Sequence, residues 1–120
     1  MRDSLTKKYK EEFFMLNKKD RTLESYMKAG AEMRLLKIIG GRVAVDVSYV
    51  LSAADTDKFL KALRMIEEVC TKAEDNMFRD YPNLDGTYTD VFFGSINETP
   101  RNDVDRTVIE MARTMADELF

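Results

Sequence analysis

The chain has 120 residues, a net charge of −3, 44% hydrophobic residues and 34% charged residues, which suits one folded domain. It contains no histidine, and this excludes Ser-His-Asp hydrolysis and zinc sites built on histidine. Its one cysteine, Cys70, cannot form an internal disulfide, and the charged N-terminus lacks the apolar stretch of a secretory signal. We therefore expect a single helical domain over residues 1–120, located in the cytoplasm and without a membrane span.

Charge is distributed unevenly along the chain. Residues 1–42 carry eleven basic and six acidic side chains, a net charge of +5, whereas residues 43–120 carry eight basic and sixteen acidic side chains, a net charge of −8. Either the basic third folds against the acidic remainder, or it forms a basic face that meets an acidic partner. Asp117 and Glu118 fall at the carboxyl end of the last expected helix, where the helix dipole disfavours them. We expect cations of the basic third nearby.

Apolar spacing predicts one helix over residues 4–18 and a second over residues 21–39. The second helix begins near Asp20 or Thr22, because either side chain can cap its first turn. Gly40 is suited to the cap at its carboxyl end. In the first helix, apolar residues recur at spacings of four, four and three and share one face: Leu5, Tyr9, Phe13 and Leu16.

The segment that follows fits two structures. Its valines and Tyr49 alternate with small or polar residues, which is the pattern of a half-buried strand. The same segment also places Val43, Val47 and Leu51 on one face of a helix. The predicted fold is therefore mainly α, with a small β element at residues 42–50 and 87–93 as the open alternative.

The longest apolar stripe predicts a helix over residues 52–79 that organises the domain. Ser52 and Asp55 have the spacing of a capping box, and Pro82 follows the end of the helix. A last amphipathic helix is expected over residues 103–120, so the whole chain resembles a four-helix bundle. The stripe of the long helix steps by three and four: Phe59, Leu63, Ile66, Cys70, Ala73 and Met77.

Four carboxylates on the long helix are the best catalytic candidates. Oxygen ligands suit Mg²⁺, and helical nucleotide pyrophosphatases hold that ion with several such residues. However, Thr71 stands where their Glu-Glu-x-x-Glu pattern needs its third carboxylate, and no second pair follows at helical spacing. We therefore predict no metal and no other cofactor, and keep magnesium-dependent nucleotide hydrolysis as the alternative function. The residues of that alternative are Glu67, Glu68, Glu74 and Asp75.

Basic and aromatic residues are interleaved near the N-terminus. This combination can bind single-stranded nucleic acid, but the aromatics fall on the helical stripe, so we expect them to pack in the core. The four consecutive apolar residues at 13–16 exceed what one helix face buries, so we expect a homodimer through the first or last helix. We predict a non-catalytic protein-interaction or regulatory module with a protein partner. Its candidate interaction residues are Lys7, Lys8, Lys10, Phe14, Lys18, Lys19 and Arg21.

Overall fold

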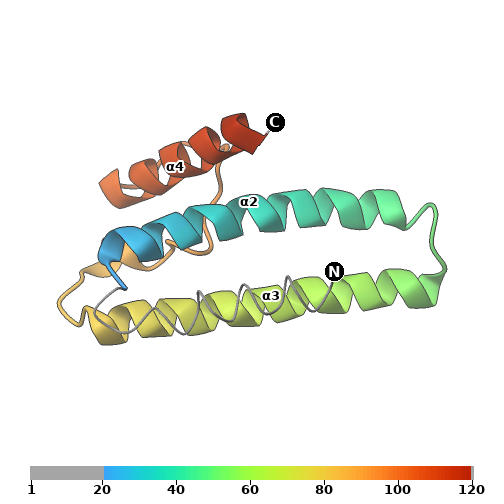
Figure 1. Ribbon diagram of the computed structural model, residues 1–120, viewed down its shortest axis with the longest axis horizontal. Helices are drawn as coiled ribbons and strands as arrows, with labels where there is room; N and C mark the ends of the chain where they lie inside the picture. The colour runs from blue at the N-terminus through green and yellow to red at the C-terminus, as the bar shows by residue number, and fades with distance from the viewer. Residues whose placement is uncertain (1–20, 120) are drawn as a thin grey trace, which may run out of the picture.

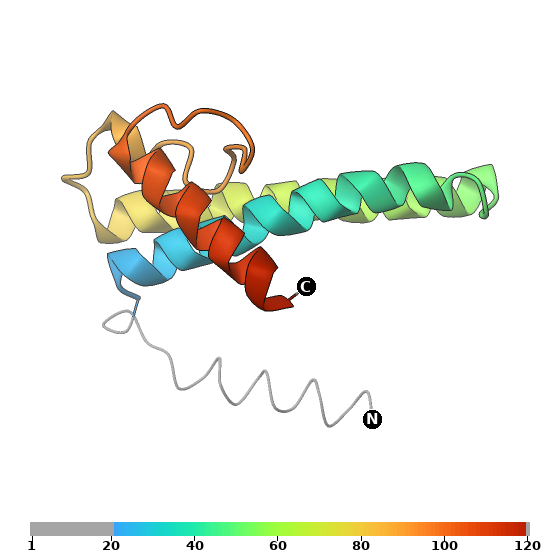
Figure 2. The same ribbon diagram turned by 90° about the horizontal axis from the view of Figure 1, so that it is seen from above.

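A computed structural model describes residues 21–119, and this part of the chain forms a small bundle of three α-helices (Figure 1). The helices are α2 (Leu23–Val47), α3 (Ala53–Asp80) and α4 (Asp103–Leu119), and the short 3₁₀ helix η2 covers Gly86–Tyr88. α2 and α3 lie side by side and antiparallel, while α4 crosses the first half of α2 (Figures 1 and 2). The helix expected over residues 4–18 lies outside the described residues.

The helices begin where the sequence supplies caps, as expected. Thr22 and Ser52 each accept a hydrogen bond from the backbone N–H three residues later, at 3.0 and 3.1 Å. The side-chain oxygen of Asn102 does the same for α4 at 2.8 Å. These bonds satisfy N–H groups that the first turn of a helix leaves free. α3 ends at Asp80, two residues before Pro82.

α2 is longer than predicted, and the β element at residues 42–50 is wrong. The helix continues to Val47 through Gly40, which is buried within it and does not cap it. A Cβ at this glycine would lie 2.6 Å from Leu63 Cδ2, so its absence lets α2 and α3 pack closely. That packing outweighs the β propensity of the valines. Residues 87–93 form turns and part of η2, and no strand occurs anywhere in the described part of the chain.

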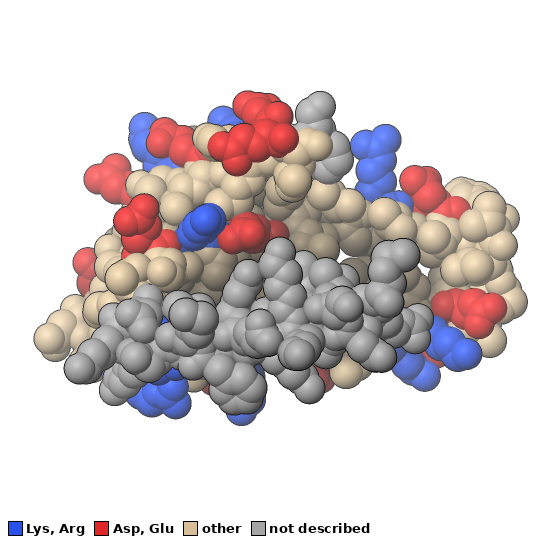
Figure 3. Space-filling view, viewed as in Figure 1, with Lys and Arg blue, Asp and Glu red and all other residues tan. Residues whose placement is uncertain are grey.

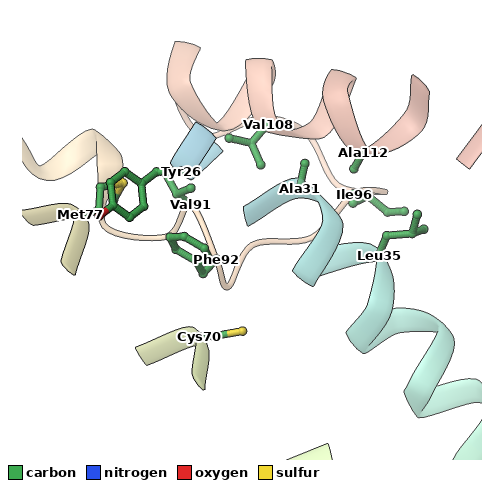
Figure 4. Packing of buried hydrophobic residues seen from close by; sticks show 10 residues of the cluster. All are labelled: Tyr26, Ala31, Leu35, Cys70, Met77, Val91, Phe92, Ile96, Val108 and Ala112. Atoms are coloured by element: carbon green, nitrogen blue, oxygen red, sulfur yellow. The ribbon is translucent and has the colours of Figure 1, made fainter. Parts of the chain in front are cut away.

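The hydrophobic core lies where α2, α4 and the loop between α3 and α4 meet the second half of α3 (Figure 4). Cys70 and Met77 are the buried residues of α3, so the stripe predicted for this helix does face inwards. Cys70 is fully buried, as expected from its place on that stripe. The core cluster consists of Tyr26, Ala31, Leu35, Cys70, Met77, Val91, Phe92, Ile96, Val108 and Ala112.

The α2/α3 hairpin extends beyond this core. Residues 41–69, which we call the arm, contain no buried residue, although both helices are regular there. The arm is visible in Figure 2 as the end of the hairpin that neither α4 nor the loop reaches. None of the described helices has the length and apolar character needed to cross a membrane.

Candidate functional site

Arg21 is the one predicted interaction residue that lies among the described residues, and it is engaged within the molecule. Its Nε donates a 3.0 Å hydrogen bond to Asp80 Oδ2, and its carbonyl oxygen accepts a 2.9 Å hydrogen bond from the Tyr81 hydroxyl. The Tyr26 hydroxyl also donates to Asp80, at 2.5 Å. Arg21 therefore ties the start of α2 to the end of α3. Outside the described residues lie Lys7, Lys8, Lys10, Phe14, Lys18 and Lys19.

The four carboxylates of the hydrolase alternative are spread over two faces of α3. Glu67 and Glu74 are about two turns apart and share a face, while Glu68 and Asp75 each lie about 100° further round the helix. Burial raises the pKa of Glu74, and the negative charges of Asp90 and Asp75 add to that effect. Within the described part of the chain, no group of three or more acidic or cysteine side chains is arranged to hold a metal ion. Magnesium-dependent hydrolysis gains no support from this geometry.

Among the described residues, the side chain with the most hydrogen bonds is that of Arg34, which is buried in α2. Its Nε donates to Val91 O at 3.0 Å, and its Nη2 donates to Asp90 O at 2.6 Å. Its Nη1 donates to Ser95 O at 3.0 Å and to Asp105 Oδ1 at 2.7 Å. These bonds use four of the five N–H donors of a guanidinium group. The arginine therefore clamps the loop and the first turn of α4 onto α2.

A cleft of about 390 Å³ lies beside Arg34 and its hydrogen-bond partners, with Asp90, Glu98 and Arg101 among its lining residues. The guanidinium of Arg101 is bound to Asp90 at 2.5 Å, so the cation of the cleft is already paired. Burial alone would raise the pKa of Asp105, but hydrogen bonds from the Arg101 backbone and from Arg34 hold it below its ordinary value of 3.8. These contacts hold the loop and the helices together, and they engage three of the four charged residues that line the cleft: Asp90, Arg101 and Asp105.

An apolar groove runs between α2 and α4, with a volume of about 510 Å³. Lys28 and Glu118 both line it, so one cation of the basic third lies beside the same groove as the acidic end of α4. Within residues 21–119, no ion pair joins Asp117 or Glu118 to a cation. The expected pairing with residues 1–20 falls outside the described residues.

The end of the hairpin carries the most exposed large apolar side chains of the described residues. Tyr49 and Val50, in the turn between α2 and α3, are 83% and 78% exposed, and Val45 and Leu51 beside them are also exposed. We call these four residues the hairpin tip. The Leu51 N–H donates to Val47 O at 2.9 Å, which closes the turn. In Figure 3 the extreme end of the hairpin is an uncharged surface with acidic and basic side chains on either side of it.

Charged residues next to the tip pair with each other. Lys61 lies 2.9 Å from Asp57, and Lys58 lies 3.7 Å from Asp55, both within the first turns of α3. Such exposed pairs contribute only about 0–1 kcal/mol each. These two pairs balance the charges on the α3 side of the tip.

Sequence reasoning missed the hairpin tip. The alternation in residues 42–50 was compatible with a half-buried strand, and a strand would have hidden half of these side chains. A usable signal is the run Tyr49-Val50-Leu51 directly before the capping residue Ser52, because a helix–helix connection lies at the surface.

These features define the described part of the molecule as a small bundle of three packed helices with an exposed apolar tip. No protein-family model, curated protein or solved structure matches the chain.

Proposed function

We propose that this protein is a non-catalytic protein-binding module and that the hairpin tip is its binding surface. The observation that supports this most is the pair of adjacent, highly exposed side chains Tyr49 and Val50. Burying a large apolar side chain contributes about 1.5–3 kcal/mol. Neither residue contributes to the core of its own chain, so this free energy is available to a complex.

The shape of the arm also supports the proposal. The arm holds the tip away from the core, at the end of two regular helices, so a partner can approach it without displacing α4 or the loop that precedes α4 (Figure 2). Tyrosine is enriched among the residues that dominate binding energy at protein interfaces.

The partner that fits this surface is a protein with an apolar cleft. Charge near the tip is balanced by the pairs of Asp57 with Lys61 and Asp55 with Lys58, so no strongly charged partner is selected. The homodimer expected through the first or last helix stays a separate prediction.

Site-specific photocrosslinking of the full chain in its native host tests the proposal. A photoreactive residue at Val50 is expected to capture one defined protein, whereas the same residue at Arg79, an exposed position at the other end of α3, is not. The captured protein is then purified, and its affinity for the unchanged protein is compared with its affinity for a variant of the tip. The double variant Tyr49→Ser/Val50→Ser should weaken binding by about tenfold or more.

The matched control is Leu119→Ser, which changes an exposed leucine at the end of α4. This variant should bind the partner as tightly as the unchanged protein. Equal affinities for the tip variant and the control would contradict the proposed surface, whatever protein the crosslinker had captured.

A further inference from the structure

One side of the α2/α3 hairpin is marked by the loop that follows α3. Arg34 of α2 binds the loop carbonyl of Asp90, and Glu74 of α3 lies near the Asp90 carboxylate. Val43 lies nine residues from Arg34, and Met65 lies nine residues from Glu74. Nine residues are two and a half turns of an α-helix. Val43 and Met65 therefore face the side opposite to the loop.

Apolar side chains of both helices gather on that opposite side, which we call the open face: Leu36, Val43, Met65 and Val69. Leu36 lies about 200° round α2 from Arg34, and Val69 follows Met65 by about one turn. Met65 and Val69 are 64% and 53% exposed, and the other two are also exposed. A face formed by two adjacent helices is the surface on which a further amphipathic helix packs.

The chain enters the hairpin at the edge of this face. Asp80 lies eleven residues beyond Val69, which is about three turns, so both lie on the same line along α3. Arg21 is held there by its 3.0 Å hydrogen bond to Asp80 and by the bond from the Tyr81 hydroxyl to its carbonyl. Twenty residues of the chain precede Arg21.

The apolar stripe in those twenty residues has the length of the open face. From Leu5 to Leu16 it spans eleven residues, about 16 Å as a helix. Along α3, Val69 and Met65 lie about 16 and 22 Å from Asp80. The last residue of the stripe, Leu16, lies five residues before the anchored Arg21. The stripe can therefore start beside the anchor and extend along α3 as far as Val69 and Met65.

We propose that residues 5–16 pack as an amphipathic helix on the open face of the same chain, as a fourth helix of the bundle. The anchor, the length of chain before it and the apolar stripe together favour this occupant. Lys7, Lys8 and Lys10 lie off the stripe and stay in solvent. Tyr49 lies about 42 Å along α2 from Arg21, beyond the reach of the segment, so the hairpin tip stays free.

Limited trypsin digestion of the full chain tests this arrangement. Two variants of exposed α3 residues are compared, Val69→Asp on the open face and Leu60→Asp, which lies nine residues away and thus on the other side of the helix. Val69→Asp should release the segment and raise its cleavage rate by about tenfold or more. Leu60→Asp should leave that rate unchanged. The sites followed are Lys7, Lys8 and Lys10.

Tyr9→Asp tests the same contact from the segment and should raise cleavage equally, while circular dichroism checks that each variant stays helical. Cleavage of the unchanged protein as fast as a free peptide of residues 1–20 would overturn the proposal. An equal response to Val69→Asp and Leu60→Asp would also overturn it. Protection that disappears on dilution would assign the open face to a second copy and reject the intramolecular contact.

Discussion

Arg34 of α2 and Asp105 in the first turn of α4 form a 2.7 Å ion pair whose side chains are 1% and 6% exposed. Three further hydrogen bonds from the arginine reach carbonyl oxygens of Asp90, Val91 and Ser95. Burying both charges costs desolvation, so a pair of this kind is costly to break from one side. The pair determines how the loop and α4 are placed on α2.

Removing one partner of this pair should destabilise the protein strongly. Asp105→Ala leaves the Arg34 charge buried without a counterion, and we expect the free energy of unfolding to fall by about 3–5 kcal/mol. Asp57→Ala, which removes the exposed partner of Lys61, should lower it by about 1 kcal/mol or less. Urea denaturation of both variants measures the difference. Similar losses of unfolding free energy in the two variants would show that the buried pair stabilises the protein no more than the exposed pair.

Two glycines of α2 should respond to alanine with opposite signs. A Cβ at Gly30 would lie 2.5 Å from Val91 Cγ1 and 2.6 Å from its carbonyl oxygen, so Gly30→Ala should cost about 1–3 kcal/mol through overpacking. A Cβ at Gly41 meets nothing within 4 Å, so Gly41→Ala should stabilise the helix by about 0.5–1 kcal/mol. Thermal unfolding followed by circular dichroism tests this, and a shift of the same sign in both would contradict it.

Acid should weaken the protein through Asp105. Its pKa lies below the ordinary 3.8 in the folded state, because hydrogen bonds from the Arg101 backbone and Arg34 outweigh the opposing effect of burial. The stabilisation is fully present above the unfolded-state pKa and is lost as pH falls through the folded-state pKa. Urea unfolding from about pH 5 to about pH 2 should show this loss. Asp105→Asn should show a shallower dependence on pH, and an unchanged slope would exclude this carboxyl as the cause.

Alkali should act through Tyr26. Burial, helped by the hydrogen bond to Asp80, raises the pKa of Tyr26 from 10.0 to about 12. The resulting stabilisation is fully present below pH 10.0 and is lost as pH rises towards about 12. Ultraviolet titration of the five tyrosines should therefore contain a late phase. Tyr26→Phe should remove that phase and cost about 1.5–3 kcal/mol at neutral pH.

The control for this titration is Tyr49→Phe, because Tyr49 at the hairpin tip is exposed and far from Asp80 in the sequence. This variant should keep the late phase and the stability of the unchanged protein. Loss of the late phase in Tyr49→Phe would contradict the assignment of that phase to Tyr26.

Local features of the sequence determine where most of the helices lie. α3 was expected over residues 52–79 and covers Ala53–Asp80, and α4 was expected over residues 103–120 and covers Asp103–Leu119. Caps and apolar stripes specify these elements because both act between residues three or four positions apart. The same short-range patterns predict the mainly α class. They also place Cys70 on the inner stripe of α3 and Asp117 and Glu118 at the carboxyl end of α4.

The length of α2 and the place of Arg34 are decided only in the tertiary structure. Residues 42–47 fit a strand or a helix locally, and the close approach of Gly40 to Leu63 selects the helix. Arg34 reads as an ordinary exposed cation, because its acceptors lie 56 to 71 positions away in the chain. The exposure of the hairpin tip is likewise a matter of what the other elements leave uncovered. Spacing within a helix contains no information on such contacts, since they depend on how separate elements pack.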